Sequence, residues 1–321
     1  MRLAILAYDG CMATEVFSIP DTLLIANEIA KARGQAHAPY QLDVIGLDTR
    51  TVRAAGGFEL GVRKPVGKYD MIVVPGLAIG GVPHLEAKLA TLTREIAYLR
   101  KSFAQGMPVA SICVGAYLLG EAGLLAGRRA TTSWLFAPDM ARRYPLSGLA
   151  SNQILVEDGA VTTTGAATSA FDLAIHLVKR LYGAKIATAT ARVCLLPNER
   201  VSQSPYVDET MMPHAMPSFS QGVRRYLVNR LAEPYDLDAL AAAFHVSART
   251  LLRRVKSETG RTPLAMLQEA RVEKAKHLLA STRWSTARVI EDVGYTDVPS
   301  FSRLFTGIVG ESPAKYRLQF K

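Results

Sequence analysis

Cys113 has the surroundings in which a cysteine side chain can do chemistry. It follows the apolar run 109–112 and precedes a helical pattern that begins at Ala116. A strand that turns sharply into a helix has the form of a nucleophile elbow, because the turn lifts one side chain above the sheet and the helix N-terminus lowers the pKa of a thiol. The alternative is a buried cysteine that only packs against its neighbours. These residues alone leave both interpretations open.

A second set of chemically suited residues lies in the last hundred residues, which contain a repeat. In each copy a short helix ends at a tight turn, after which the hydroxyl of Ser247 or Thr296 is placed to cap a second helix. This plan predicts two helix-turn-helix units. The aligned segments are 240–247 with 289–296, and Gly260-x-x-Pro263 with Gly310-x-x-Pro313.

The second helix of each copy presents polar residues opposite its core residues. Leu251 and Val255 define the core face in the first copy, and Phe301 and Phe305 define it in the second. Ordinary solvated arginines are the alternative for one such helix, but two copies favour DNA binding, for which arginine supplies bidentate contacts to bases and phosphates. The candidate DNA-binding residues are Ser247, Arg249, Thr250, Arg253, Lys256, Thr296, Pro299, Ser300, Arg303 and Thr306.

The elements that must position Cys113 alternate between strands and helices. This order is typical of an α/β fold with a mainly parallel sheet sandwiched by helices, which we expect over residues 1–195. Strand-like runs cover residues 2–7, 41–47, 70–74, 109–112 and 160–163, and helical patterns cover 21–32, 84–104, 116–122 and 169–182.

The elements that must position the repeat are helices only. Prolines cluster at positions 197, 205, 213 and 217 without sustained periodicity, which indicates a linker over residues 196–218. Beyond it strand signals vanish, so residues 219–321 are predicted to form an all-α domain with two helix-turn-helix units. The length of 321 residues agrees with two domains that have separate cores.

The net charge of +10 is distributed unevenly along the chain. From Ser218 onward 17 Lys and Arg face 10 Asp and Glu, which leaves +7 for this segment and +3 for the rest. Such asymmetry indicates a polyanionic partner for the C-terminal domain, although a solvated basic surface is the alternative.

The cysteines and histidines give no support to a metal or cofactor. Cys11, Cys113 and Cys194 are odd in number and form no C-x-x-C pair, which argues against disulfides and zinc and favours a reducing cytoplasm. No H-E-x-x-H motif and no glycine-rich phosphate loop is present, so we expect no cofactor. The longest apolar stretch, 107–120, is too short to span a bilayer, so no membrane association is expected. We expect His176 in the core, and His37, His84 and His214 in loops or on the surface.

Residues 219–320 resemble the DNA-binding domain of the AraC/XylS family. The resemblance rests on Ser247-Ala-Arg-Thr-Leu-Leu-Arg-Arg-Val-Lys256, on residues 292–305 and on Ser312-Pro-Ala-Lys-Tyr-Arg317. It implies two helix-turn-helix units joined by a long helix, here 263–279, that contact successive major grooves. Val255 stands where the family has Phe, and Thr306-Gly307 replaces Phe-Lys followed by a polar residue, which implies weaker phosphate binding by the second unit.

Residues 1–195 resemble the class I glutamine amidotransferase-like, PfpI-type domain. The resemblance rests on Tyr8-Asp-Gly10 and on residues 69–76, 112–134 and 172–178. It implies that the elbow cysteine works with a histidine and is approached by an acid, here Glu15. Related regulators read Ala-Thr-Thr-His-Trp, whereas this chain has Ser133, so the histidine is absent. At the carboxyl ends of the strands we expect a ligand site lined by Glu15, Gly76, Cys113, Val114 and Ser133.

Together the two resemblances imply a one-component transcription regulator. Its first domain senses a small-molecule effector, with an amino acid or a quaternary amine as the implied class, and its second domain binds double-stranded promoter DNA. Further expected partners are RNA polymerase and a second copy of the chain. Two alternatives remain: a thiol hydrolase or glyoxalase-like enzyme with a DNA-binding tail, and an architectural DNA binder whose first domain only dimerises.

Overall fold

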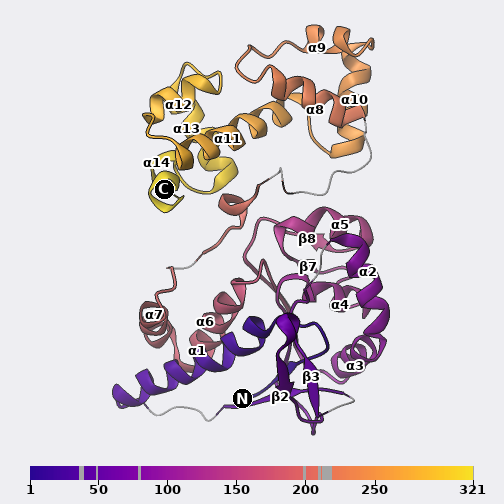
Figure 1. The fold of residues 1–321 in the computed structure, drawn as a ribbon, viewed down its shortest axis with the longest axis vertical. Helices are drawn as coiled ribbons and strands as arrows, with labels where there is room; N and C mark the ends of the chain where they lie inside the picture. The colour runs from indigo at the N-terminus through magenta and orange to yellow at the C-terminus, as the bar shows by residue number, and fades with distance from the viewer. Residues whose placement is uncertain are drawn as a thin grey trace. The chain divides into compact units, whose positions relative to one another are not determined.

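The chain folds into two compact units, Met1–Gln203 and Ser204–Lys321. The computed structural model describes residues 1–35, 40–47, 50–78, 81–197, 200–208, 211 and 219–320. The predictions for His37, His214, Pro213 and Pro217 lie outside these residues. The division between the units falls within residues 196–218, the segment predicted to be a linker. Figure 1 shows the first unit from indigo to pink and the second unit through orange to yellow.

A six-stranded sheet forms the centre of the first unit, in the order β2-β1-β5-β6-β10-β9. All neighbouring strands are parallel except β10 and β9. Every residue of β5, β6 and β10 is buried, as expected for parallel strands covered on both faces. The strands are β1 Arg2–Leu6, β2 Gln41–Ile45, β5 Met71–Val74, β6 Val109–Ser111, β9 Leu155–Asp158 and β10 Val161–Thr164.

The register of the sheet brings two chain segments to the same edge. Val74, the last residue of β5, pairs with Ser111, the last residue of β6. The chain continues from these two residues to Gly76 and Cys113, each two positions beyond its strand. Parallel strands end at the same edge, so Gly76 and Cys113 become neighbours although 37 positions separate them in the sequence.

Helices lie on both sides of the sheet. In Figure 1, α1, α6 and α7 pack together on one side, and α2, α3, α4 and α5 lie on the other. The mainly parallel α/β sandwich predicted from the sequence is confirmed. The helices are α1 Ala13–Ala32, α2 Val82–Thr91, α3 Thr93–Ala104, α4 Ala116–Glu121, α5 Ala137–Arg143, α6 Ser169–Tyr182 and α7 Ala184–Val193, with 3-10 turns η1 Ala55–Gly57, η2 Cys113–Gly115 and η3 Trp134–Phe136.

Two predicted helices have different bounds in the structure. The helix predicted from residue 21 begins at Ala13 and contains Pro20, because burial of Val16 and Ile19 favours the helical conformation ahead of the proline. The single helix predicted over 84–104 is two helices, since α2 ends at Thr91, whose hydroxyl bonds the carbonyl of Lys88 at 2.7 Å. A threonine hydroxyl that competes for helix carbonyls in this way favours a helix end.

Several short elements were not predicted. Most of them are strands of two or three residues that show no hydrophobic period. The unpredicted strands are β3 Thr51–Arg53, β4 Glu59–Gly61, β7 Arg129–Ala130 and β8 Gly148–Leu149, in addition to β9 in the main sheet.

In the second unit, helices are the only regular elements among the described residues from 219 to 320. The 3-10 turn η4 Ser204–Tyr206 precedes the helices. They are α8 Phe219–Asn229, α9 Leu237–Ala243, α10 Ala248–Thr259, α11 Pro263–Ser281, α12 Thr286–Asp292, α13 Val298–Val309 and α14 Pro313–Phe320. The predicted pairs of helices, α9 with α10 and α12 with α13, are both present. No helix among the described residues has both the length and the apolar character needed to cross a bilayer.

The long helix α11 takes part in two separate cores of this unit. Met266 and Leu267 pack in the core that includes Leu251 and Val255 of α10. Further along α11, Ala275 and Leu279 pack in a second core. One continuous helix therefore carries a helix-turn-helix unit at each end. The second core also contains Phe301 and Phe305 of α13.

The two glycines that the repeat aligns follow the ends of corresponding helices. Gly260 follows α10 and Gly310 follows α13, and both have left-handed backbone conformations with φ of 71° and 90°. Glycine adopts this conformation without the cost that a Cβ imposes, which accounts for its recurrence at both positions.

Candidate functional site

Cys113 occupies a sharp turn between β6 and α4. Its φ of 54° is rare for a residue that is not glycine, and it marks the strained backbone of an elbow. Gly115 allows the turn to lie against the neighbouring strand end, because a Cβ there would lie 2.5 Å from the carbonyl oxygen of Val74. The sequence-based interpretation of a strand, an elbow and a helix therefore describes the local structure correctly.

Glu15 and Gly76 adjoin Cys113 at this edge of the sheet. The backbone N–H of Gly76 donates to Oε2 of Glu15 at 2.5 Å. A Cβ on Gly76 would lie 3.1 Å from Oε2 of Glu15 and 3.2 Å from Cβ of Cys113, so only glycine fits between them without displacing a neighbour. Glu15 is fully buried, and its Oε1 has no hydrogen-bond partner among the described residues. The geometry thus leaves a buried carboxyl oxygen available beside the cysteine.

Both acidic groups at this edge favour their protonated forms. Burial raises the pKa of Glu15 from 4.5 to about 7, against the opposing effect of the Gly76 hydrogen bond. Burial, followed by the charge of Glu15, raises the pKa of the Cys113 thiol from 9.0 to about 12. The expectation that the helix N-terminus lowers this thiol pKa is wrong, because burial of the sulfur raises the pKa by more than the backbone hydrogen bond from Val114 lowers it.

Ser133 and Val114 complete the predicted ligand-site residues. Ser133 is almost fully buried, and its side chain lowers the pKa of the Cys113 thiol, although the effect of burial is larger. The neighbouring Thr132 donates its hydroxyl to the Cys113 carbonyl oxygen at 2.9 Å. The side chain of Val114 is buried, so Val114 can offer only its backbone to a ligand. The structure therefore brings Glu15, Gly76, Cys113 and Ser133 together. Val114 follows Cys113, with only its backbone available to a ligand.

Tyr8 is a neighbour of this site that the sequence reading did not single out as a site residue. Its ring is buried, and its hydroxyl donates to the carbonyl oxygen of Pro75, next to Gly76. Burial raises its pKa well above the ordinary value, with smaller contributions from Cys11 and Glu15. The motif Tyr8-Asp-Gly10, at the end of the first strand, was the sequence signal from which Tyr8 could have been identified as a site residue.

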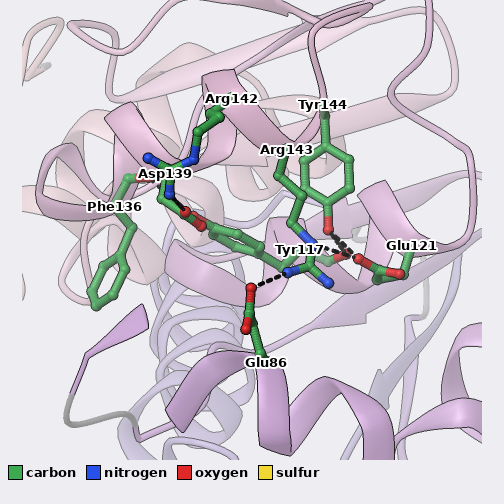
Figure 2. Close-up of polar contacts among 8 residues, drawn as sticks. All are labelled: Glu86, Tyr117, Glu121, Phe136, Asp139, Arg142, Arg143 and Tyr144. Carbon is green, nitrogen blue, oxygen red and sulfur yellow. Dashed lines mark hydrogen bonds and ion pairs between the residues drawn. The ribbon is translucent and has the colours of Figure 1, made fainter. Parts of the chain in front are cut away.

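The helix α4, which follows Cys113, is held in place by the polar network drawn in Figure 2. Tyr117 of α4 donates to Oδ2 of Asp139 at 3.1 Å, and Tyr144 donates to Oε1 of Glu121 at 2.7 Å. Arg143 donates to the same Glu121 oxygen at 2.8 Å and pairs with Glu86 of α2 at 3.3 Å. The network thus ties α4 to α5 and α2, which fixes the helix that follows Cys113.

His176 does not lie in the core as predicted. It is half-buried on α6, with Nε2 3.0 Å from Oε2 of Glu157 on β9. Burial lowers its pKa, and the charge of Glu157 opposes this effect. The amphipathic pattern of α6 was read correctly, but it could not show that a partner from the antiparallel edge strand stabilises a polar side chain at this position. His84 is exposed, as expected.

No cluster of histidine, cysteine and acidic side chains suited to a metal ion is present in the described part of the chain. An open cleft of about 530 Å³ lies between the end of α1 and α7, lined by Arg33, Lys185, Thr188, Ala189, Arg192 and Val193. None of the residues around Cys113 lines this cleft. It is therefore separate from the candidate site at the elbow.

In the second unit, α10 presents the predicted basic face to solvent. Leu251 and Val255 are fully buried, and Arg249, Arg253 and Lys256 on the opposite face are exposed. Ser247 caps the helix as predicted, since its hydroxyl accepts the backbone N–H of Thr250 at 3.3 Å. These three cations form a surface that a DNA duplex could approach.

The corresponding helix α13 presents a less charged face. Pro299, Arg303 and Thr306 are exposed opposite the buried Phe301 and Phe305, and Nη2 of Arg303 donates to Ser300 at 3.1 Å. The prediction that Thr296 caps this helix is wrong. The cap is Asp297, whose carboxylate accepts the backbone N–H of Ser300 at 2.8 Å, because a carboxylate one position further on reaches the first turn.

Comparisons with known proteins give a family match within each of the two units. Residues 1–180 match the DJ-1/PfpI family, and residues 240–319 match a helix-turn-helix domain. The HTH-type transcriptional regulator GbdR of Pseudomonas aeruginosa is 24% identical over 320 residues, covering 98% of this chain and 83% of that protein. Isonitrile hydratase of Pseudomonas putida is 33% identical over 153 residues, covering 46% of this chain and 62% of the enzyme.

A solved structure shows the same fold for the first unit. The crystal structure of a ThiJ/PfpI family protein from Pseudomonas syringae has a TM-score of 0.50 and 17% identity, and covers 62% of this chain and 76% of that one. Fold, exposed basic helices and relatives together define a DNA-binding transcription regulator with an enzyme-like first domain. The chain belongs to the DJ-1/PfpI family, and its second unit is of the AraC/XylS type.

Proposed function

We propose that the first unit binds a small-molecule effector at the Glu15–Cys113 edge, and that binding there controls how the helical unit binds promoter DNA. The observation that carries this proposal is the buried Oε1 of Glu15, which has no hydrogen-bond partner among the residues that the structure describes, next to a partly exposed Cys113. A buried carboxyl group with a free acceptor favours a ligand that donates hydrogen bonds or carries positive charge. An amino acid or a quaternary amine has such a charge.

Catalysis at this edge is not part of the proposal. The pKa of Cys113 is raised to about 12, so the thiolate needed for nucleophilic attack is scarce at neutral pH. Ser133 has no basic nitrogen with which to take the thiol proton. The specific observation that favours an enzyme is the similarity to isonitrile hydratase over 153 residues. A thiol hydrolase with a DNA-binding tail is therefore the second candidate.

The proposal also covers the setting in which the regulator acts. We place it in the cytoplasm, where its three free cysteines would stay reduced. We further propose that it acts as a homodimer at the promoter and contacts RNA polymerase there. The proposed DNA contacts are Ser247, Arg249, Thr250, Arg253 and Lys256 of the first repeat, and Thr296, Pro299, Ser300, Arg303 and Thr306 of the second.

Replacing Cys113 with serine separates the two candidate functions. A sensor needs shape and polarity at this position, so we expect the variant to bind promoter DNA as the parent does. We also expect a metabolite found by thermal shift to bind with only a modestly changed affinity. The measurements are promoter binding with and without that metabolite, and, for both proteins, hydrolysis of amides, conversion of glyoxals to hydroxy acids and hydration of isonitriles. Turnover by the parent that disappears in the variant would establish the enzyme instead.

Replacing Arg253 with alanine tests the DNA interface. Arg253 lies on the exposed face of α10 between two further cations, where a base contact is expected. Loss of a bidentate base contact costs about 1 to 3 kcal/mol, so binding to the specific promoter should weaken about 5-fold to about 150-fold, and binding to random DNA much less. Titration of both DNAs at one salt concentration measures the difference.

A neighbouring arginine provides the matched control. Arg254 lies next to Arg253 but stacks over the ring of Phe219 at 3.8 Å, so its replacement with alanine should leave sequence preference unchanged. Replacement of Arg303 with alanine should have a smaller effect than that of Arg253, because α13 carries less charge. Equal losses on specific and random DNA for the Arg253 variant would show that this residue contacts only phosphate.

A further inference from the structure

Gln203 is a buried polar residue at the point where the chain leaves the first unit. It is the last residue of that unit, and Ser204 begins the second. Only 2% of Gln203 is exposed, although its surrounding sequence reads as linker. A glutamine so deeply buried needs partners for its whole amide group, and the structure supplies them from three loops of the first unit.

The amide oxygen of Gln203 accepts hydrogen bonds from two loops. The backbone N–H groups of Trp134 and Ala166 each donate to Oε1 at 3.2 Å. Trp134 directly follows Ser133 of the candidate effector site, and Ala166 lies just beyond β10. The oxygen thus joins the site loop to the end of a central strand.

The amide nitrogen of Gln203 is surrounded by acceptors. Four oxygens lie within 3.3 Å of Nε2, which has only two N–H groups to share among them. A carboxylate in this place would face the same oxygens without a donor, so the surroundings select an amide over an acid of equal size. The four acceptors are Thr131 Oγ1 and the carbonyl oxygens of Thr132, Ser151 and Gln153.

The backbone around Gln203 is shaped to receive its side chain. A Cβ on Gly165 would lie 2.5 Å from Cδ of Gln203, so the amide fits only because residue 165 is glycine. The backbone N–H of Gln203 also donates to the Asn152 carbonyl at 2.7 Å. The position is therefore built by several segments at once.

The contacts of Gln203 bracket Ser133 on both sides. Nε2 bonds the carbonyl of Thr132 at 2.9 Å, and Oε1 bonds the N–H of Trp134 at 3.2 Å. The hydroxyl of Thr132 in turn donates to the carbonyl of Cys113 at 2.9 Å. One side chain thus holds the loop that places Ser133 beside the elbow cysteine.

We propose that Gln203 is a positioning residue of the effector site and ties that site mechanically to the segment that continues into the helical unit. A ligand that shifts the loop 131–134 must strain or release the bonds of Gln203. Because Ser204 belongs to the next unit, such a release acts on the chain exactly where the helical unit begins. This inference rests on the proposed function for its purpose, since only a sensor needs such a connection.

Arg200 offers a matched control for this role. Its guanidinium bonds the Thr168 hydroxyl and carbonyl at 3.1 and 3.0 Å and pairs with Asp172 of α6. It fastens the same segment to the first unit as Gln203 does, but through partners that lie outside the loop 131–134. Loosening the segment and freeing the loop can therefore be separated by substitution.

The experiment compares Gln203→Glu, Gln203→Met and Arg200→Ala with the parent in the full-length protein. Alkylation of Cys113 by iodoacetamide, followed by peptide mass spectrometry to resolve it from Cys11 and Cys194, reports on the loop. Amide hydrogen exchange of the peptides that contain 131–134 and 200–208 reports on the two connected segments. Thermal melts followed by circular dichroism verify that each variant folds.

We expect both Gln203 variants to raise the Cys113 alkylation rate about fivefold or more, because their lost hydrogen bonds leave buried groups unpaired. Exchange in 131–134 and 200–208 should rise together. Arg200→Ala should raise exchange near residue 200 and leave Cys113 alkylation at the parental rate.

Three results would overturn the proposal. They are parental alkylation in folded Gln203 variants, an equal rise in Arg200→Ala, and loss of folding in both Gln203 variants, which would make the residue purely structural. The test uses neither effector nor DNA. Its failure therefore leaves the proposed regulatory function standing, and failure to find an effector would not alter its outcome.

Discussion

Replacing Arg271 with alanine is expected to lower the free energy of unfolding of the helical unit by about 3 to 6 kcal/mol, because two hydrogen bonds from a charged group, each worth about 1.5 to 3 kcal/mol, are lost. Arg271 lies in the middle of α11 and is 7% exposed. Its guanidinium donates to the carbonyl oxygens of Leu231 at 2.8 Å and Glu233 at 2.7 Å, and lies over the ring of Tyr295. Alanine would leave these carbonyls without their donor and open a cavity beside the ring.

Urea unfolding measures this loss, and the chain offers a probe for each unit. Trp284 is the only tryptophan of the helical unit and Trp134 the only one of the first, so a Trp134→Phe background reports on the helical unit alone. Arg283→Ala, which removes an exposed arginine from the same unit, is the matched control and should change the free energy little. The loss of unfolding free energy for Arg271→Lys should lie between the losses for Arg271→Ala and Arg283→Ala, since one ammonium group cannot make both of the hydrogen bonds that the guanidinium makes. A loss below about 1 kcal/mol for Arg271→Ala would mean that water replaces the missing donor.

Replacing Glu15 with glutamine is expected to remove a pH dependence of stability from the first unit. The pKa of Glu15 is raised from 4.5 to about 7 on folding, so the folded state holds the proton more tightly. Stability from this group is fully present below pH 4.5 and is lost as the pH rises to about 7. Each pKa unit corresponds to about 1.4 kcal/mol, so the whole change amounts to roughly 3 kcal/mol.

The measurement compares urea unfolding of parent and variant between pH 4.5 and 8, followed by Trp134 fluorescence in a Trp284→Phe background. The difference in unfolding free energy between the two proteins should shift in favour of the glutamine variant as the pH rises. Glu28→Gln, which alters an exposed carboxylate of the same helix that pairs with Lys31 at the surface, is the matched control. A constant difference between parent and Glu15→Gln across this range would show that Glu15 is already ionised in the folded protein.

The local elements of the first unit could be read from the sequence because each is encoded by neighbouring residues. The helix over 169–182 was predicted with the bounds of α6, since its apolar residues recur at helical spacing over four turns. The central strands were found from short β-rich runs. The short strands outside the main sheet and the break between α2 and α3 carry no such pattern, and they were missed.

The repeat in the helical unit was also readable, because both copies keep the same order of helix, turn and cap. The buried pairs Leu251 with Val255 and Phe301 with Phe305 confirm the face assignment. The cap of the second copy was misplaced from Asp297 to Thr296, because both side chains can accept a backbone N–H and only the backbone path selects between them.

The sequence by itself thus determined the α/β order, the two helix-turn-helix units and the strand and helix on either side of Cys113, since all of these depend on residues a few positions apart. The tertiary structure alone decided which distant groups meet. Strand register brings Gly76 to Cys113 and the first helix adds Glu15, and the resulting burial raises both pKa values. Gln203 is a further residue whose environment the sequence did not predict. Its neighbours are prolines and serines, which indicate a linker, whereas in the structure three distant loops surround its amide. Such contacts arise from packing between distant segments, and no local sequence pattern predicts them.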